Sequence, residues 1–405
     1  MTYELINNIL VIVGTVIALL IVFNPRLIQW RTWRATVTPL ASIIGSGFLV
    51  LGPILERDYG IYSVLVMAGL CLASYSIGAA IRFNILEYDR IGVKGIPKSV
   101  QLIETVASWV LVFAYVISVA YYLNLFGVFA VKLTPADSGM TARLVTTGAL
   151  IFIAAFGYSR GLLAMERMEE VAVGLKLAII AGLLIGMTAY SFELTQTTGL
   201  HISQPRITGL RSIAVAFGLI ITVQGFETSR YLGNEYDAAT RVKTMRYAQW
   251  IAAIIYMIYI VLTTVSFPPD QVESNETAII DMTRIVAPLL PALLVVAALA
   301  AQFSAAVADT SGSGGLAEEL SRKKVRSNDA YAILAVGAIT ITWLADIYQI
   351  ISYASRAFAI YYFLQAIIAT RFALDRDKRP WLQIVFFVLV AALSLAVVVF
   401  GIPVE

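Results

Sequence analysis

Cysteine and histidine are nearly absent from this chain. Its 405 residues include one cysteine, Cys71, and one histidine, His201. A single cysteine permits no internal disulfide and no zinc cluster. A single histidine in a polar connection supports neither metal chemistry nor a histidine-based catalytic triad. We therefore expect no metal and no cofactor, and an enzyme is disfavoured.

Charge is also scarce. Asp, Glu, Lys and Arg make up 14% of the chain, whereas 59% of its residues are hydrophobic, and the mean hydropathy is +0.82. This composition is too apolar for a soluble fold of this length and indicates a polytopic protein of the lipid bilayer. The net charge of +3 is small, so we expect no nucleic-acid partner.

Runs of about 20 apolar residues predict the transmembrane helices. Twelve are expected, at residues 4–23, 34–54, 59–81, 101–131, 141–157, 166–191, 211–232, 245–267, 277–308, 329–346, 348–372 and 380–401. The first run has no basic n-region and no small-residue cleavage site, so we interpret it as a helix of the mature protein rather than a signal peptide.

Lys and Arg predict the orientation in the membrane. With the loop 24–34 in the cytoplasm, 21 of the 29 Lys and Arg residues fall in cytoplasmic loops and 6 on the other side. This bias follows the positive-inside rule. Both termini are then non-cytoplasmic, and a bacterial inner (plasma) membrane is the default location.

Setting the first and last spans aside leaves ten, which divide into residues 34–191 and 211–372. Five helices per half place the halves in opposite orientations, as in inverted-repeat transporters. We predict an all-α fold with a 5+5 inverted repeat, preceded by an extra helix and loop at 1–33 and followed by a helix at 380–405.

Glycine interrupts the first helix of each half. Gly45-Ser46-Gly47 lies inside the first of these helices, and Gly225 lies 180 residues after Gly45. Such paired breaks are typical of a carrier's binding site, because unwound backbone then lines a cavity instead of facing lipid. Lys176 and Arg356, in the fifth helix of each half, are also 180 residues apart, which favours a repeat.

The two breaks differ in the charge they would attract. The N–H groups freed at Gly45 and Gly47 would form an anion site, aided by the helix dipole, that fits a ligand carboxylate. Alternatively, these glycines only allow close helix packing. At the second break, unwound carbonyls and Glu227 would face a cation such as a ligand ammonium. Alternatively, Glu227 snorkels or pairs with Arg230.

These motifs are similar to those of a known family. Ile44-Gly45-Ser46-Gly47-Phe48 resembles the glycine-rich first-helix motif of the amino acid–polyamine–organocation (APC) superfamily. Gly225-Phe226-Glu227, followed by Thr228 and later by Asn234-Glu235-Tyr236-Asp237, resembles its sixth-helix signature. The resemblance covers about residues 34–372. The extra helix before this core, and the single helix after it, depart from the usual family pattern.

Membership implies the LeuT-like fold, in which the substrate carboxylate binds first-helix N–H groups and the amino group binds sixth-helix carbonyls. Carried over, Ser46 and Gly47 hold the carboxylate within the segment from Ile44, and Phe226 is the candidate gate of the segment from Gly225 to Thr228.

Lys176 is the candidate coupling residue. A lysine deep inside a span costs a few kcal/mol unless it is paired or hydrated. It resembles the fifth-helix lysine that replaces sodium in proton-coupled relatives. Ser304 of the eighth core helix would complete this site, and Ala305 removes the second hydroxyl that sodium prefers. The resemblance implies proton coupling; snorkelling of Lys176 is the alternative.

Three further residues are candidates for the site. Tyr115, at the middle of the third core helix, would close the cavity. Asp309 begins a glycine-rich stretch, 309–315, which we expect to be a flexible cytoplasmic exit beside the inner vestibule. Arg356 stays charged and would either select anions or form an ion pair; the candidate partners are Glu227, Asp309, Glu104 and Asp281.

Together these features predict a secondary carrier that works by alternating access. Its partners would be protons and a small substrate, either an amino acid or a related amine or zwitterion. A sodium-coupled carrier, or an inorganic- or organic-ion carrier of the same fold, is the first alternative. A channel is disfavoured by the repeat within one chain, and a membrane sensor by the lack of large soluble loops.

Overall fold

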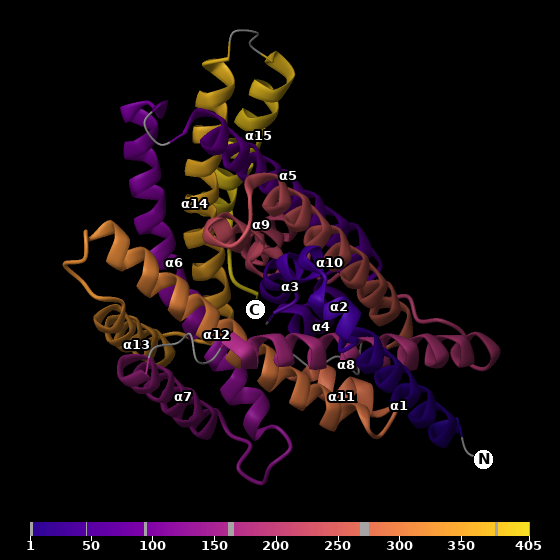
Figure 1. Cartoon of the computed structure of the whole chain (residues 1–405). Coiled ribbons are helices and arrows are strands. Elements are labelled where there is room, and N and C mark those ends of the chain that lie inside the picture. The colour runs from indigo at the N-terminus through magenta and orange to yellow at the C-terminus, as the bar shows by residue number, and fades with distance from the viewer. Residues whose placement is uncertain are drawn as a thin grey trace.

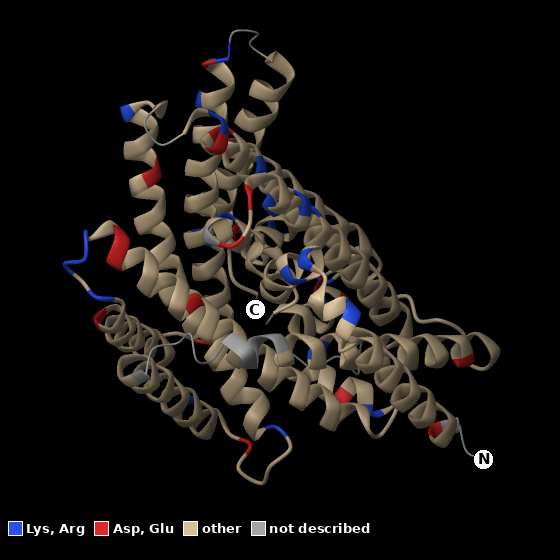
Figure 2. Ribbon diagram, viewed as in Figure 1, with Lys and Arg blue, Asp and Glu red and all other residues tan. Residues whose placement is uncertain are grey.

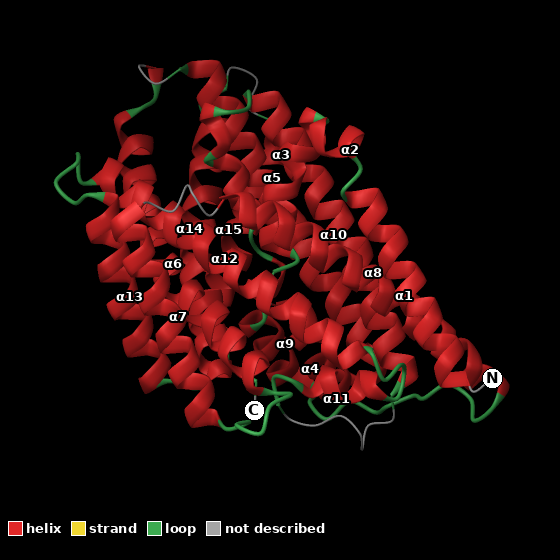
Figure 3. Ribbon diagram, turned by 60° about the horizontal axis from the view of Figure 1, so that its bottom comes forward, coloured by secondary structure: helices red, strands yellow, loops and turns green. Residues whose placement is uncertain are grey.

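The computed structural model describes residues 3–45, 47–92, 95–160, 166–267, 275–376 and 380–404. Within these ranges all regular structure is helical (Figure 3). Nine helices in the described part are long and apolar enough to cross a membrane. The predicted all-α polytopic fold is confirmed.

The first half of the chain contains the helices before the second break (Figure 1). They are α1 (Tyr3–Val22), α2 (Pro25–Gln29), α3 (Arg31–Ile43), α4 (Gly47–Tyr59), α5 (Ser63–Ile91), α6 (Lys98–Val131), α7 (Gly139–Arg160) and α8 (Glu166–Gln196), with a short 3₁₀ turn η1 (Gly60–Tyr62) after α4.

The second half begins with a short helix and three 3₁₀ segments, and continues with longer helices. They are α9 (Gly209–Gly218), η4 (Ile220–Val223), η5 (Phe226–Arg230), η6 (Leu232–Asn234), α10 (Ala238–Ser266), α11 (Ala278–Arg284), α12 (Leu290–Leu320), α13 (Ser327–Leu344), α14 (Ile347–Leu374) and α15 (Trp381–Phe400).

Both predicted breaks are present. α3 ends at Ile43, and the helix resumes as α4 at Gly47. After α9 the chain passes through η4, an extended Gln224 and Gly225, whose φ of +115° suits glycine and strains other residues. The second break is longer than the sequence predicts, because regular α-helix resumes only at α10.

Several helices start where a polar side chain caps them. The Asp346 carboxylate accepts a hydrogen bond from the Gln349 N–H, and the Gln349 side-chain oxygen accepts one from the Asp346 N–H, so α14 begins with a capping box. Asp237 caps α10 through the N–H and hydroxyl of Thr240, and these hydrogen bonds hold the pKa of Asp237 below its ordinary value.

The prediction of a flexible exit at residues 309–315 is wrong. This stretch is helical and belongs to α12, which continues to Leu320. The reason is packing on both sides of the helix. A Cβ at Gly314 would lie 2.2 Å from the Tyr331 ring, so this glycine lets α13 approach closely, whereas Gly312 and Gly315 are exposed.

The extra first helix packs along α8 (Figures 1 and 3). Glycines of α8 allow this contact: a Cβ at Gly182 would lie 2.1 Å from the Thr15 hydroxyl oxygen, and one at Gly186 would lie 2.6 Å from Val11. Small residues at a helix interface let backbones come close in a membrane. α1 therefore covers the fifth core helix.

The chain ends lie at one edge of the bundle. Figure 3 shows the N and C labels, α4 and α11 at the lower edge and α2 at the upper edge. Figure 2 shows Lys and Arg around α2 and α3 and in the connection between α12 and α13. The basic segments around α2, α3 and the α12–α13 connection thus lie away from the edge that carries α4 and α11.

Candidate functional site

The two broken helices touch each other at their glycines. A Cβ at Gly47 would lie 2.5 Å from the Thr222 Cβ, and a Cβ at Gly225 would lie 2.5 Å from the Ser42 Cβ. Neither position accepts a larger residue without moving the opposite segment. The close packing that the sequence leaves as an alternative is therefore real, and it joins the two breaks directly.

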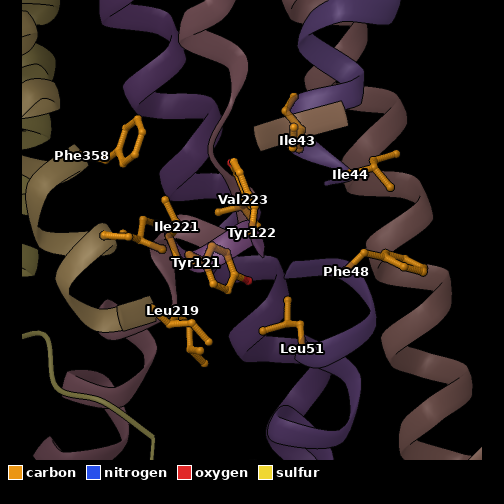
Figure 4. Close-up of a cluster of buried hydrophobic side chains, with 14 of the residues drawn as sticks. Ile43, Ile44, Phe48, Leu51, Tyr121, Tyr122, Leu219, Ile221, Val223 and Phe358 are labelled. Carbon is orange, nitrogen blue, oxygen red and sulfur yellow. The ribbon is translucent and has the colours of Figure 1, made fainter. Parts of the chain in front are cut away.

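Side chains from neighbouring helices satisfy the unwound carbonyls. The Tyr256 hydroxyl, on α10, lies 3.0 Å from the Ile43 oxygen and 2.6 Å from the Thr222 oxygen. The Ser74 hydroxyl, on α5, donates to the Val223 oxygen at 2.9 Å. Because unpaired backbone groups are costly inside a membrane, these contacts stabilise the non-helical backbone. Figure 4 shows the apolar side chains around it, including Ile43 and Val223.

Lys176 is buried on α8, with 1% of its surface exposed. Its ammonium donates to the Ala41 oxygen, on α3, at 2.6 Å. On α14, the Ser355 hydroxyl occupies a similar place: it accepts from the Ile221 N–H at 3.1 Å and donates to the Gly218 oxygen at 2.6 Å. In each half the fifth core helix thus bonds to the backbone of the broken helix.

Glu227 braces the second break. Its carboxylate accepts hydrogen bonds from the Gly225 N–H and the Tyr362 hydroxyl, both at 3.0 Å. The Tyr362 ring also stacks on Phe226, with 5.4 Å between ring centroids. Arg230 forms its ion pair with Glu104 at 2.7 Å rather than with Glu227.

A cavity of about 440 Å³ lies between the broken helices, α6 and α12. Its walls include Ser42, Tyr115, Thr228, Asp309, Gly312 and Glu319. Two of these side chains are carboxylates, and no Lys or Arg of the described chain lines the cavity. Glu319 is exposed near the end of α12, so the cavity extends toward the side that the sequence predicts to be cytoplasmic.

The predicted site residues fall into two groups. Tyr115, Thr228 and Asp309 line the cavity. The others that the structure describes are not part of its walls: Ile44, Gly45, Gly47, Gly225, Phe226, Glu227, Lys176, Ser304 and Arg356. Ser46 lies outside the described residues.

Asp309 is nearly buried, and its carboxylate accepts a hydrogen bond from the Ser118 hydroxyl on α6. Our sequence analysis missed Ser118. It also missed Tyr122, whose hydroxyl accepts from the Gln224 amide at 3.1 Å. Tyr115, Ser118 and Tyr122 are spaced by three and four residues, which places them on one face of α6. This spacing is the sequence signal that could have identified Ser118 and Tyr122.

Ser304 and Arg356 lie away from the cavity. The Ser304 hydroxyl donates to the Ala301 oxygen of its own helix at 3.1 Å. Arg356 is half-buried, and its Nε donates to the Gly401 oxygen at 2.9 Å. The structure thus places Arg356 against the end of α15, and no carboxylate of the described chain lies within ion-pair distance of it.

A sequence model of APC superfamily transporters matches residues 25–401 of this chain. The chain belongs to the APC superfamily. An Aquifex aeolicus (strain VF5) protein, described as an uncharacterized protein, is 40% identical over 407 residues, which cover 99% of this chain and 98% of that protein. The matched residues run from the start of α2 to the end of α15, so they include the core. The first helix, α1, lies before the match.

As an APC superfamily transporter, the chain is an integral multi-pass membrane protein that moves a small molecule. The resemblance inferred from the two glycine motifs is confirmed.

Proposed function

We propose that this transporter is a proton-coupled secondary carrier of an amino acid or a related small amine or zwitterion. The observation that carries the proposal is the cavity of about 440 Å³ between the two broken helices. Transporter sites are typically built where discontinuous helices meet near the bilayer midplane.

We propose that residues 34–191 and 211–372 form the inverted repeat. The contacts of the fifth core helices support this assignment. Lys176 bonds to Ala41 in the first half, and Ser355 bonds to Ile221 in the second. Ala41 and Ile221 are 180 residues apart, which is the spacing of the glycine breaks. A shared register in contacts as well as in sequence is expected of a repeat.

The structure supports an inward-facing state of this cycle. Every residue of α4 is buried, so the predicted outer half of the first broken helix is closed. The cavity instead reaches Thr38, Leu232 and Glu319, which lie near the predicted cytoplasmic ends of their segments. Alternating access requires a second state in which the outer half opens and this cavity closes.

Charge favours a substrate with an amino group. Asp309 and Glu319 are the charged residues that line the described cavity, and a carboxylate attracts an ammonium group. Arg356 is held at Gly401, so it adds no positive charge here. A zwitterion would place its carboxylate at the N–H groups of the first break.

The surroundings of Lys176 favour protons over sodium as the coupling ion. An ammonium donates to the Ala41 oxygen, and deprotonation would leave a neutral amine with one donor fewer. Such a change would weaken the contact between α8 and α3. The Ser304 hydroxyl donates a hydrogen bond to the Ala301 oxygen, and Ala305 has no hydroxyl. Few side-chain oxygens are therefore free to coordinate a sodium ion here.

The test uses the purified protein in proteoliposomes. A thermal-shift screen of amino acids, amines and small anions first identifies ligands that stabilise it. We expect labelled ligand to accumulate under an inward proton gradient, and to show saturable counterflow without one. Accumulation that needs a sodium gradient would support the sodium-coupled alternative instead. Flux without counterflow would indicate a channel.

A further inference from the structure

Another buried carboxylate lies on α4, outside the walls of the cavity. Glu56 is 1% exposed and sits near the end of α4 that is predicted to face outward. One of its carboxyl oxygens, Oε1, accepts a hydrogen bond from the Ser203 hydroxyl. Ser203 belongs to the segment 201–207, which leads from α8 to α9.

Two buried oxygen atoms beside each other lack partners here. The Glu56 Oε2 atom and the Thr264 hydroxyl oxygen, on α10, are both fully buried, and neither has a hydrogen-bond partner among the described residues. Thr264 faces the same carboxyl group. Buried polar atoms are almost always paired, so two adjacent unpaired oxygens call for a chemical explanation.

The surrounding backbone holds this arrangement in place. The Ile61 N–H donates to the Ser203 oxygen at 2.9 Å, and the Arg206 N–H donates to the Asp58 oxygen at 2.9 Å. At the other end, the His201 N–H donates to the Val265 oxygen at 3.1 Å. The segment 201–207 is therefore tied to both α4 and α10, and it encloses Glu56.

Gly60 makes the close approach possible. Its φ is +50°, and a Cβ there would lie 2.3 Å from the Ser203 oxygen. Any larger residue would push the segment 201–207 away from α4.

Several charged and titratable groups lie on the elements packed around Glu56. Arg57 pairs with Asp58 at 2.7 Å. Two tyrosines on adjoining elements donate to backbone oxygens: Tyr59 donates to Ser212, and Tyr259 of α10 donates to Leu49. Asp281 of α11 forms ion pairs with Lys132 and Arg284. The other titratable groups nearby are His201 and Arg206 of the segment 201–207, and Tyr348, which lies near Arg57 and Asp58.

A hydrogen bond between the Glu56 Oε2 atom and the Thr264 hydroxyl pairs both atoms, whichever of the two supplies the proton. In the ionised form, the Thr264 hydroxyl donates to Oε2, and Glu56 is a buried negative charge with hydrogen bonds from two hydroxyls and no ion pair among the described residues, which is unfavourable. In the protonated form, the Oε2 hydroxyl donates to the Thr264 oxygen while Oε1 accepts from Ser203. The hydrogen bonds are kept, and the buried charge is removed.

We propose that Glu56 is a proton-binding site at the outer end of α4, occupied while α4, α10 and the segment 201–207 are packed around it. Release of the proton leaves an unpaired charge that only water can solvate, so the outer end opens. Uptake of a proton from outside closes it again. This site deepens the proposed proton-coupled transport and is separate from Lys176.

The experiment reads the opening of α4 directly, without a substrate. In a Cys71→Ser background, a single cysteine replaces Leu51, which is fully buried on α4 (Figure 4). Right-side-out membrane vesicles are treated with a membrane-impermeant thiol reagent over a range of external pH. We expect labelling to rise as the external solution becomes alkaline, and Glu56→Gln to abolish this pH dependence.

Two further variants separate the proton site from a general loss of structure. Thr264→Val keeps the shape and removes a hydroxyl whose hydrogen bond stabilises the carboxylate more than the carboxylic acid, so the labelling transition should move toward alkaline pH. Asp137→Asn removes an exposed carboxylate in the connection between α6 and α7 and should leave the transition unchanged.

Wild-type pH dependence in Glu56→Gln, or an unmoved transition in Thr264→Val, would overturn the proposal. So would a labelling change that follows sodium concentration instead of pH, because it would assign the site to a metal cation. Uptake driven by a proton gradient is measured on the same variants. If the wild type takes up ligand with the proton gradient but its labelling does not depend on pH, the Glu56 site alone is refuted. If its labelling depends on pH but uptake is not driven by the proton gradient, the proton-coupled carrier alone is refuted.

Discussion

Single residues at the breaks would have two functions in the proposed carrier, because the backbone proposed to bind a ligand is also the contact between the two broken helices. Gly47 faces Thr222 across this contact. We expect Gly47→Leu to separate the segments and abolish ligand binding, since its side chain has no space to occupy.

Equilibrium binding of a ligand from the thermal-shift screen measures this effect. Gly69→Leu is the matched control, because Gly69 is exposed on α5 and a Cβ there meets nothing within 4 Å. Normal binding by Gly47→Leu would remove the first break from the site.

Asp309 is the cavity residue with the strongest predicted effect on an amine ligand. Asp309→Asn keeps the size of the side chain and removes its charge. A hydrogen bond to a charged group contributes about 1.5–3 kcal/mol, so ligand affinity should fall by roughly 10- to 100-fold. Isothermal titration on this variant and on Asp137→Asn gives the comparison; equal affinities would contradict the assignment.

The sequence places candidate residues by their position along a span: Tyr115 lies at mid-span, Thr228 lies in the second break, and Asp309 lies at the start of a glycine-rich stretch. It does not identify partners that are distant along the chain. Glu56 looks like an ordinary charged residue at a helix end, next to Arg57 and Asp58. Its burial depends on the segment 201–207, which folds back over α4 from 140 or more residues away.

At the scale of elements, the breaks and most helices follow from apolar runs interrupted by glycine. The continuation of α12 through residues 309–315 does not follow from the sequence, because glycine is common both in flexible loops and at close helix contacts. Only the position of Tyr331 on α13 shows which applies at Gly314. Likewise, the first apolar run predicts α1, but its neighbour α8 is revealed by the structure alone.

The contact between α1 and α8 can be tested through Gly182. Gly182→Leu would drive a side chain into Thr15, and overpacking of this kind typically costs about 1–3 kcal/mol. We expect a lower thermal unfolding temperature in detergent. Gly148→Leu on α7, where a Cβ meets nothing within 4 Å, should change it little. Equal unfolding temperatures would mean that α1 does not stabilise α8.

At the scale of the whole molecule, the structure combines a cavity that extends toward one side with a closed α4 on the other. Two of the ionisable groups at the broken helices carry the proposed proton sites: Lys176 of α8 bonds to α3, and Glu56 sits at the end of α4. In the proposed cycle, protons at these groups bias which side is open, and the amine ligand binds between the breaks.

Lys176→Ala tests whether transport by this protein is coupled to protons. The measurement is ligand accumulation in proteoliposomes under an imposed proton gradient, with ligand binding measured on the same preparation. We predict that the variant binds ligand but does not accumulate it, because the proton-dependent bond to Ala41 is gone. Wild-type accumulation driven by the proton gradient in Lys176→Ala would contradict the account.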